Sequence, residues 1–167
     1  MNSSGDLKAF VGRHGGVVCT SCNAAGVLQW ALDRAGEVGK VLFFPDQHLG
    51  RNTALAMGYE ESEMAVWNPM AEPAWDALES AKFVLWHGYC SVHQRFTVEQ
   101  IKGIRSEYPG AMVISHPECS RDVVEASDAS GSTEMIRRYV ADAPSGSVIG
   151  VGTEIHLVQR LNDEYPD

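Results

Sequence analysis

The sequence predicts an α/β protein made of repeated three-layer α/β/α units with short parallel sheets. Two observations lead to this prediction. Short runs of consecutive apolar residues, many of them β-branched, recur along the chain, and such runs are typical of strands buried on both faces of a parallel sheet. Segments with apolar residues at helical spacing lie between most of these runs, and strand–helix alternation is typical of parallel α/β units.

The predicted strands are apolar runs that are bounded by glycine, proline or charged residues. They lie at residues 16–20 (GVVCT), 40–44 (KVLFF), 82–86 (KFVLW), 111–115 (AMVIS) and 147–152 (SVIGVG). The same rhythm occurs in both halves of the chain. We therefore expect one α/β unit at residues 1–81 and a second at residues 82–167.

The predicted helices have apolar residues on one stripe and polar residues at their start. Thr97 suits an N-cap because Val98, Ile101 and Ile104 follow at helical spacing. By contrast, residues 59–73 carry several charges and two prolines, so we expect a loop-rich segment there. The helices are expected at residues 23–35, 97–108, 120–127, 132–141 and 154–161.

Composition excludes several classes of function. The 167 residues are 44% hydrophobic and 21% charged, which is an ordinary globular balance. The net charge is −9, from 13 Lys and Arg against 22 Asp and Glu, so nucleic acid and anionic membranes are poor partners. No signal peptide or membrane-length apolar run is present, so a cytoplasmic location is expected.

The cysteines are expected to be thiols or metal ligands, because disulfides are rare in a reducing compartment. Cys90 and His93 form a C-x-x-H pair just after a predicted strand, within WHGYCSVH. Such a pair can hold a metal or join a thiolate to an imidazole. No second pair completes a zinc site, so a buried cysteine near an exposed histidine is an equal alternative.

Two further strand ends carry polar groups. In SHPEC, Pro117 stiffens the turn, and His116 and Glu118 are suited to acid–base work or to orienting an anion. In GST, Ser132 and Thr133 at a helix start can cradle a phosphate or carboxylate, although a simple helix cap explains them equally.

The remaining motifs favour structural roles. Ser21 in TSCNA can help to bind an anion at a helix start, but a plain N-cap is the favoured interpretation. Residues 45–52 (PDQHLGRN) suit a tight turn. Cys119 is expected to be a small buried thiol. Taken together, the polar strand ends favour a small anionic ligand over a protein partner.

The order of these motifs resembles the quinolinate synthase family. TSCNA, FFPDQHLGRN, WHGYC, SHPEC, GST and GTEIHLVQRL follow one another at approximately the family's spacing, from Asn2 to Pro166. The resemblance implies three similar α/β domains around a pseudo-threefold axis. Residues 1–81 would be most of the second domain and residues 82–167 most of the third, with the chain truncated at both ends.

The resemblance also implies an activity. Members condense iminoaspartate with dihydroxyacetone phosphate to give quinolinate, with loss of phosphate and water, in the biosynthesis of NAD. Each domain contributes one cysteine to a [4Fe–4S] cluster, and one iron stays open for substrate. L-aspartate oxidase or aspartate dehydrogenase would supply the iminoaspartate.

Site residues follow from the motifs that match. Cys90 resembles a cluster ligand, whereas Cys119 does not. His116 and Glu118 resemble the substrate-orienting and acid–base pair, and His93 resembles another catalytic-site histidine. Substrate-binding positions expected from the resemblance are Asn2, Ser21, His116, Glu118, Ser132 and Thr133.

The sequence also departs from the family. The first domain and the final cysteine are absent, so the chain alone is expected to hold no stable cluster and to be inactive. Cys22 stands where the family usually has Ser or Ala. Two alternatives stay open: a free-standing phosphate-binding α/β module without a redox cofactor, and a non-catalytic remnant.

Overall fold

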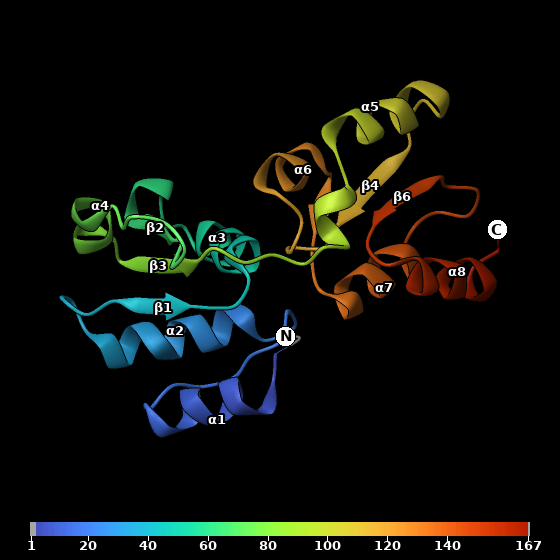
Figure 1. Ribbon diagram of the computed structural model, residues 1–167. Helices are drawn as coiled ribbons and strands as arrows, with labels where there is room; N and C mark the ends of the chain where they lie inside the picture. The colour runs from blue at the N-terminus through green and yellow to red at the C-terminus, as the bar shows by residue number, and fades with distance from the viewer. Residues whose placement is uncertain (1–2, 167) are drawn as a thin grey trace. The chain divides into compact units, whose positions relative to one another are not determined.

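The computed structural model describes residues 3–166, and the chain divides into two compact units (Figure 1). The first unit ends at Tyr89 and the second begins at Cys90. Each contains a parallel three-stranded sheet with helices packed on it, so the predicted α/β class is confirmed. No helix between residues 3 and 166 combines the length and the apolar character that crossing a membrane requires.

The first unit has the sheet order β1-β3-β2, with β3 in the centre. Val41 of β1 and Met64 of β2 both lie opposite Phe83 of β3. Helix α2 lies along β1 (Figure 1) and packs Leu28 and Leu32 into the core. The elements are α1 (Gly5–Arg13), α2 (Ala24–Ala35), β1 (Val41–Phe43), α3 (Gln47–Ala56), the 3₁₀ turn Glu61–Glu63, β2 (Met64–Trp67), α4 (Trp75–Ser80) and β3 (Phe83–Trp86).

Residues 45–52 lead into α3, which begins at Gln47, instead of forming the predicted tight turn. Asp46 is the N-cap, and its Oδ1 accepts a hydrogen bond of 2.8 Å from the Leu49 N–H. Gly50 lies inside the helix, where a Cβ would come within 2.7 Å of the Phe43 ring and 2.9 Å of Leu85. The turn prediction was wrong because this glycine serves close packing, but the motif does have a structural role.

The predicted strand at residues 16–20 is not formed within the described part of the chain. Val17 and Val18 are each 43% exposed, and no described strand pairs with them, so the β-branched residues alone do not make a strand. A groove of about 440 Å³ lies between this segment, α1, α2 and the edge strand β1. Conversely, β2 forms inside residues 59–73, where a loop-rich segment was expected.

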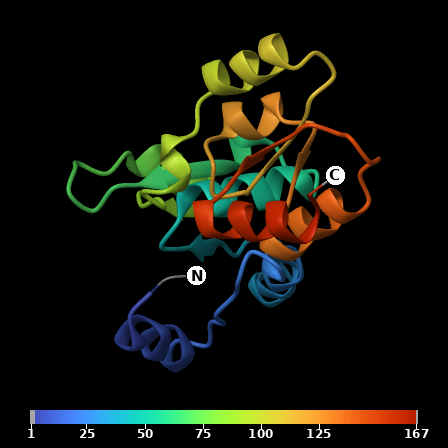
Figure 2. The ribbon, with the colours of Figure 1, turned by 90° about the vertical axis from the view of Figure 1, so that its right-hand side faces the viewer.

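The second unit has the sheet order β5-β4-β6 and helices on both faces (Figure 2). Val113 of β4 packs with α5 and α6, whereas the next residue, Ile114, packs with α7 and α8. Neighbouring strand residues point to opposite faces, which explains this division. The elements are the 3₁₀ turn His93–Arg95, α5 (Val98–Glu107), β4 (Met112–Ser115), α6 (Arg121–Ala126), β5 (Ala129–Ser130), α7 (Thr133–Ala141), β6 (Ile149–Gly152) and α8 (Ile155–Glu164).

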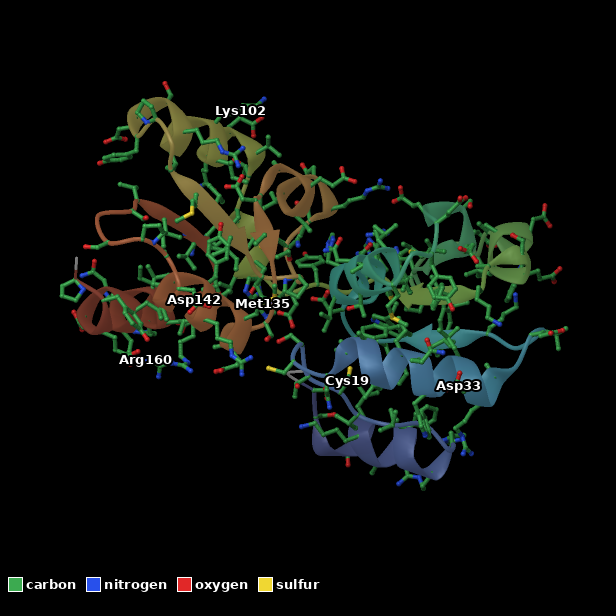
Figure 3. The ribbon with its side chains drawn as sticks, turned by 180° about the vertical axis from the view of Figure 1, so that it is seen from behind. Cys19, Asp33, Lys102, Met135, Asp142 and Arg160 are labelled. Carbon is green, nitrogen blue, oxygen red and sulfur yellow. The ribbon has the colours of Figure 1, made fainter. Side chains whose placement is uncertain are left out.

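The helices of the second unit follow the sequence prediction closely. Thr97 caps α5 in a capping box with Gln100, as its position suggested. Lys102 on α5 and Arg160 on α8 lie on the outer sides of their helices, with exposed side chains (Figure 3). Polar residues outside and apolar residues inside are what these amphipathic helices require.

Strand β3 belongs to the first sheet, although the sequence analysis placed it at the beginning of the second unit. Its residues pair with both β1 and β2. The assignment of residues 1–81 and 82–167 to two family domains stays a prediction.

Candidate active site

The second unit brings three of the polar motifs to one edge of its sheet. Ser115 of β4 lies opposite Ser130 of β5 and Gly152 of β6, so the residues after all three strands emerge together. The Gly131 N–H donates to the Ser115 carbonyl, and the His116 N–H donates to the Gly152 carbonyl, each at 3.0 Å. The motifs SHPEC, GST and GTE therefore meet where a parallel sheet normally carries its site.

Cys90, His93 and Glu118 form the centre of this site. The turn from Cys90 to His93 is closed by a hydrogen bond of 3.1 Å from the Gln94 N–H to the Cys90 carbonyl. His93 Nδ1 lies 3.1 Å from Glu118 Oε2. The thiol, the imidazole and the carboxylate each place one ligand atom within 4.8 Å of the other two. The C-x-x-H pair thus gains a carboxylate from a distant part of the sequence.

His93 is buried and held on two further sides. Its Nε2 lies 3.4 Å from the Thr153 hydroxyl, and its ring stacks on His116 with 4.4 Å between centroids and an interplanar angle of 16°. The sequence analysis missed Thr153. The available signal was the position of GTE directly after a predicted strand.

His116 is neutral at physiological pH. The pKa of this imidazole is lowered to about 4, chiefly by burial and also by the nearby His93, while the Glu118 carboxylate opposes both effects. The Glu118 backbone N–H donates to His116 Nδ1 at 3.3 Å. Because Nδ1 accepts, the neutral ring carries its proton on Nε2 and can donate from there.

Glu118 is ionised at the same pH. Burial alone would raise the pKa of its carboxyl. The hydrogen bond from His93, the neighbouring imidazoles and a hydrogen bond with Cys90 outweigh that effect, and the pKa lies below its usual range. The backbone of Glu118 is held by Gln94, whose Nε2 donates to the Glu118 carbonyl at 3.2 Å.

The two cysteines of the second unit differ in exposure. Cys90 is half-buried, whereas Cys119 is fully buried and its thiol points to the Gly152 carbonyl at 3.6 Å. All four cysteines of the chain lie within residues 3–166, and none forms a disulfide. Cys90 therefore suits one thiolate position of a metal group, and Cys119 is a core residue, as expected.

The other predicted substrate-binding residues lie at helix starts. Ser132 caps α7 by accepting a hydrogen bond from the Met135 N–H at 3.4 Å, and Thr133 is the exposed first residue of that helix. Ser21 belongs to the first unit, in the turn before α2. Asn2 lies outside the described residues. The roles expected for these four residues stay predictions.

Comparison with known proteins places the chain in a family. The model of the family described as quinolinate synthetase A protein matches residues 1–167. A quinolinate synthase of Corynebacterium glutamicum is 57% identical over 169 residues, which cover 99% of this chain and 42% of that protein. Those of Rhodopirellula baltica and Geobacillus kaustophilus are 48% and 50% identical, and the chain covers 43% and 45% of them.

The chain thus spans less than half the length of the curated relatives that it matches. The family match nevertheless extends over every motif that the structure gathers at the sheet edge. The chain belongs to the quinolinate synthetase A family.

Proposed function

We propose that this chain carries part of the active site of a quinolinate synthase. The reaction would condense iminoaspartate with dihydroxyacetone phosphate to quinolinate, with release of phosphate and water. The observation that carries the proposal is the grouping of Cys90, His93, His116 and Glu118 at one strand edge in a member of this family. A lone phosphate-binding module would have no need for a thiol beside a histidine and a carboxylate.

The ionised Glu118 is the proton acceptor in this proposal. Closing and aromatising a pyridine ring requires protons to leave carbon and hydroxyl groups to leave as water, so a base and an acid must work close together. The neutral His116 supplies a donor at Nε2, which can orient a substrate carboxylate or protonate a leaving hydroxyl. His93 holds the Glu118 carboxylate in place through its 3.1 Å contact.

Anionic groups of the substrates would bind at the helix starts. Ser132 and Thr133 stand at the N-terminus of α7, where backbone N–H groups and the helix dipole favour a phosphate or carboxylate. Ser21 would contribute a hydroxyl from the turn before α2. Because the chain has a net charge of −9, such local donors must hold an anionic substrate against the overall field.

The family's [4Fe–4S] cluster would take Cys90 as its thiolate from this chain. Bound there, the cluster supplies a Lewis-acidic open iron for a substrate carboxylate or hydroxyl. The half-buried Cys90 thiol is accessible for this role, while the buried Cys119 is not. Two further thiolates would have to come from elsewhere, so the 167-residue chain alone should neither hold a stable cluster nor make quinolinate.

Iminoaspartate would come from an L-aspartate oxidase or an aspartate dehydrogenase acting as a functional partner. An imine of this kind hydrolyses in water, so prompt delivery from a partner enzyme would help. Dihydroxyacetone phosphate would be the second small-molecule substrate.

A chimera tests the proposal. The matching segment of the Corynebacterium glutamicum relative is replaced by this chain, and the purified chimera is reconstituted anaerobically with iron and sulfide and assayed for quinolinate. We expect turnover in the chimera and none in the isolated chain. Glu118→Gln should lower turnover strongly with bound iron unchanged, while the exposed Asp163→Asn serves as the matched control.

Two outcomes would contradict the proposal. One is a chimera that folds but shows no iron–sulfur absorption, which would favour the phosphate-binding module. The other is a Glu118→Gln chimera as active as the Asp163→Asn control.

A further inference from the structure

We propose that Cys19 and Cys22 form a reversible thiol–disulfide pair that low-molecular-weight disulfides oxidise. The two residues read C-x-x-C in the segment that leads into α2, within the first unit. This spacing in an α/β unit is typical of dithiol sites that cycle between two thiols and a disulfide. Neither thiol has a part in the proposed reaction.

A tight turn holds the two cysteines near each other. The Asn23 N–H donates to the Thr20 carbonyl at 3.2 Å, and the Thr20 N–H and hydroxyl both donate to Asn23 Oδ1, at 2.7 and 3.2 Å. Cys19 and Cys22 each directly precede one end of this turn. A disulfide requires Cα atoms about 4.4–6.8 Å apart, a separation that a segment of four residues reaches when it turns back on itself.

The segment around Cys19 can adjust to form the bond. Residues 16–20 pair with no described strand, and Cys19 is the one side chain buried between residues 12 and 23, all of which the structure describes. The hydrogen bonds from Thr20 to the Asn23 side chain are exposed to solvent. Segments with few buried side chains and exposed hydrogen bonds open locally, so Cys19 can move without unfolding of the unit.

The two thiols differ in access, and this difference sets the order of the steps. Cys22 is exposed, whereas Cys19 is 4% exposed and belongs to the core cluster that includes Ala24 and Leu28. Burial raises the pKa of the Cys19 thiol, and the thiolate is the form that attacks a disulfide. Cys22 therefore reacts first with a reagent from solvent, and Cys19 completes the pair.

Two thiol–disulfide exchanges give the product. The Cys22 thiolate attacks one sulfur of the small disulfide RSSR, which forms a mixed disulfide and releases RS⁻, and this thiolate takes up the proton that Cys22 lost. The Cys19 thiol then loses its proton and attacks Cys22 Sγ, so the bond between the two cysteines forms and the second RS⁻ leaves as RSH. The chain is oxidised by two electrons, and RSSR is reduced to two thiols.

The disulfide would act on the proposed substrate site. Thr20 and Ser21 lie between the two cysteines, so closing the bond reshapes the turn that carries the Ser21 hydroxyl. Oxidation would then weaken the binding of the anionic substrate group that this hydroxyl is proposed to hold. This consequence, unlike the pair itself, rests on the proposed function.

Oxidised glutathione is the probe for the pair. The reduced, metal-free chain is incubated with it under anaerobic conditions, quenched in acid, alkylated and digested with trypsin. Both cysteines lie in one tryptic peptide, residues 14–34, which ends at the next arginine after Arg13. We expect this peptide to lose the mass of two hydrogen atoms and to carry no alkyl group. Dithiothreitol should restore two alkylatable thiols.

Three variants test the order of the steps. Cys19→Ala should stop at the mixed disulfide, so the peptide gains one glutathione. Cys22→Ser should leave Cys19 unmodified, because the remaining thiol is buried. Cys90→Ser, in the second unit, is the matched control and should form the disulfide as the unmodified chain does. Circular dichroism shows whether each variant is folded.

Three outcomes would overturn the pair. They are glutathione retained on Cys22 in the unmodified chain, a disulfide that joins Cys22 to Cys90 or to a second chain, and a Cys22→Ser variant whose Cys19 reacts as fast as Cys22 does in the unmodified chain. None of these measurements uses substrate or cluster, so the pair can fail while the proposed reaction stands.

The active chimera tests the effect on substrate binding. Treatment with oxidised glutathione should raise its KM and dithiothreitol should reverse the change, with bound iron constant. The Cys22→Ser chimera should keep its KM under the same treatment. Equal changes in both chimeras would overturn the regulatory role, whereas a reduced chimera without turnover would contradict the proposed function instead.

Discussion

Each unit places a proline followed by an acidic residue after a strand, and the acidic side chain makes different contacts in the two units. Pro45 and Asp46 follow β1 in the first unit, and Pro117 and Glu118 follow β4 in the second. The Asp46 carboxylate is buried and accepts the Leu49 N–H, so it caps α3. The Glu118 carboxylate instead faces His93 at 3.1 Å.

The distance to the next helix explains the difference. Helix α3 starts directly after Asp46, so the short aspartate side chain reaches its own helix. Helix α6 starts at Arg121, and Ser120 holds its N-cap position. Glu118 is released from capping and can meet a histidine from another part of the sequence. The acidic residue thus caps a helix in one unit, whereas in the other it contacts a histidine and is the base of the proposed function.

The largest difference between the two acidic residues is expected in turnover, when each is replaced by its amide in the active chimera. Glu118→Gln should lower turnover by about 10²- to 10⁴-fold, because a general base is lost. Asp46→Asn should keep turnover, since asparagine caps helices equally well. Quinolinate formation per bound iron measures both effects, and a larger loss in Asp46→Asn would reverse the assignment.

Deleting core atoms should destabilise each unit separately. Leu85→Ala in the first unit and Ile114→Ala in the second remove fully buried side chains, and each should cost about 2–5 kcal/mol of unfolding free energy. Leu42→Ala, at a side chain that is 45% exposed, is the control and should cost far less. Hydrogen exchange followed peptide by peptide assigns each loss to its unit. Equal losses at Leu42 and Leu85 would contradict the burial pattern.

Truncating each acidic side chain to alanine shows which of the two stabilises the helix that follows it. Asp46→Ala removes the α3 cap and should cost about 1 kcal/mol. Glu118→Ala removes no cap, so the α6 amides should be as protected from hydrogen exchange as in the parent chain. Urea unfolding gives the free energies. The assignment of a capping role to Asp46 alone would be wrong if Glu118→Ala lowered hydrogen-exchange protection in α6 as strongly as Asp46→Ala does in α3.

The smallest effect concerns Asp128, which extends the pairing of the short strand β5. Its carboxylate accepts the Val113 N–H at 2.7 Å and Arg105 at 2.9 Å. The hydrogen bond from Val113 holds the pKa of this carboxyl below its usual range. The folded state therefore gains stability when the pH exceeds the ordinary aspartate pKa, and loses that gain as the pH falls through the lowered pKa.

Asp128→Asn should accordingly be slightly less stable than the parent near neutral pH. The difference should shrink in acid and in high salt, because the side chain is largely exposed. Urea unfolding across a pH series measures it. A difference that grows in acid would show that another group is responsible.

Much of the fold could be predicted from the sequence because the local strand and helix preferences agree with the places that these segments take in the fold. Runs such as KVLFF and AMVIS are apolar on consecutive residues and became strands within the predicted ranges. The errors occurred where pairing with another strand, and not local composition, determines whether a strand forms. Strand β2 forms because Met64 and Val66 pair with β3 despite the charges around them. Residues 16–20 have the composition of a strand but pair with no described strand.

The site was predictable in parts. Motifs after strands pointed to His93, His116 and Glu118 individually, because parallel strands end at one edge. Sequence spacing gave no means to know that the Cys90 turn would lie beside Glu118, or that Thr153 would bind the far side of His93. These contacts depend on how the loops fold back over the sheet.

The burial of one cysteine in each unit gives the chain two built-in reporters. Cys19, beside α2 (Figure 3), lies in the core of the first unit, and burial raises the pKa of its thiol. Cys119 lies in the core of the second. An alkylating reagent should therefore modify Cys22 and Cys90 early and reach each core thiol only after its own unit opens. Mass spectrometry of pulse-labelled chain would then tell which unit opens first, without a dye or an engineered residue.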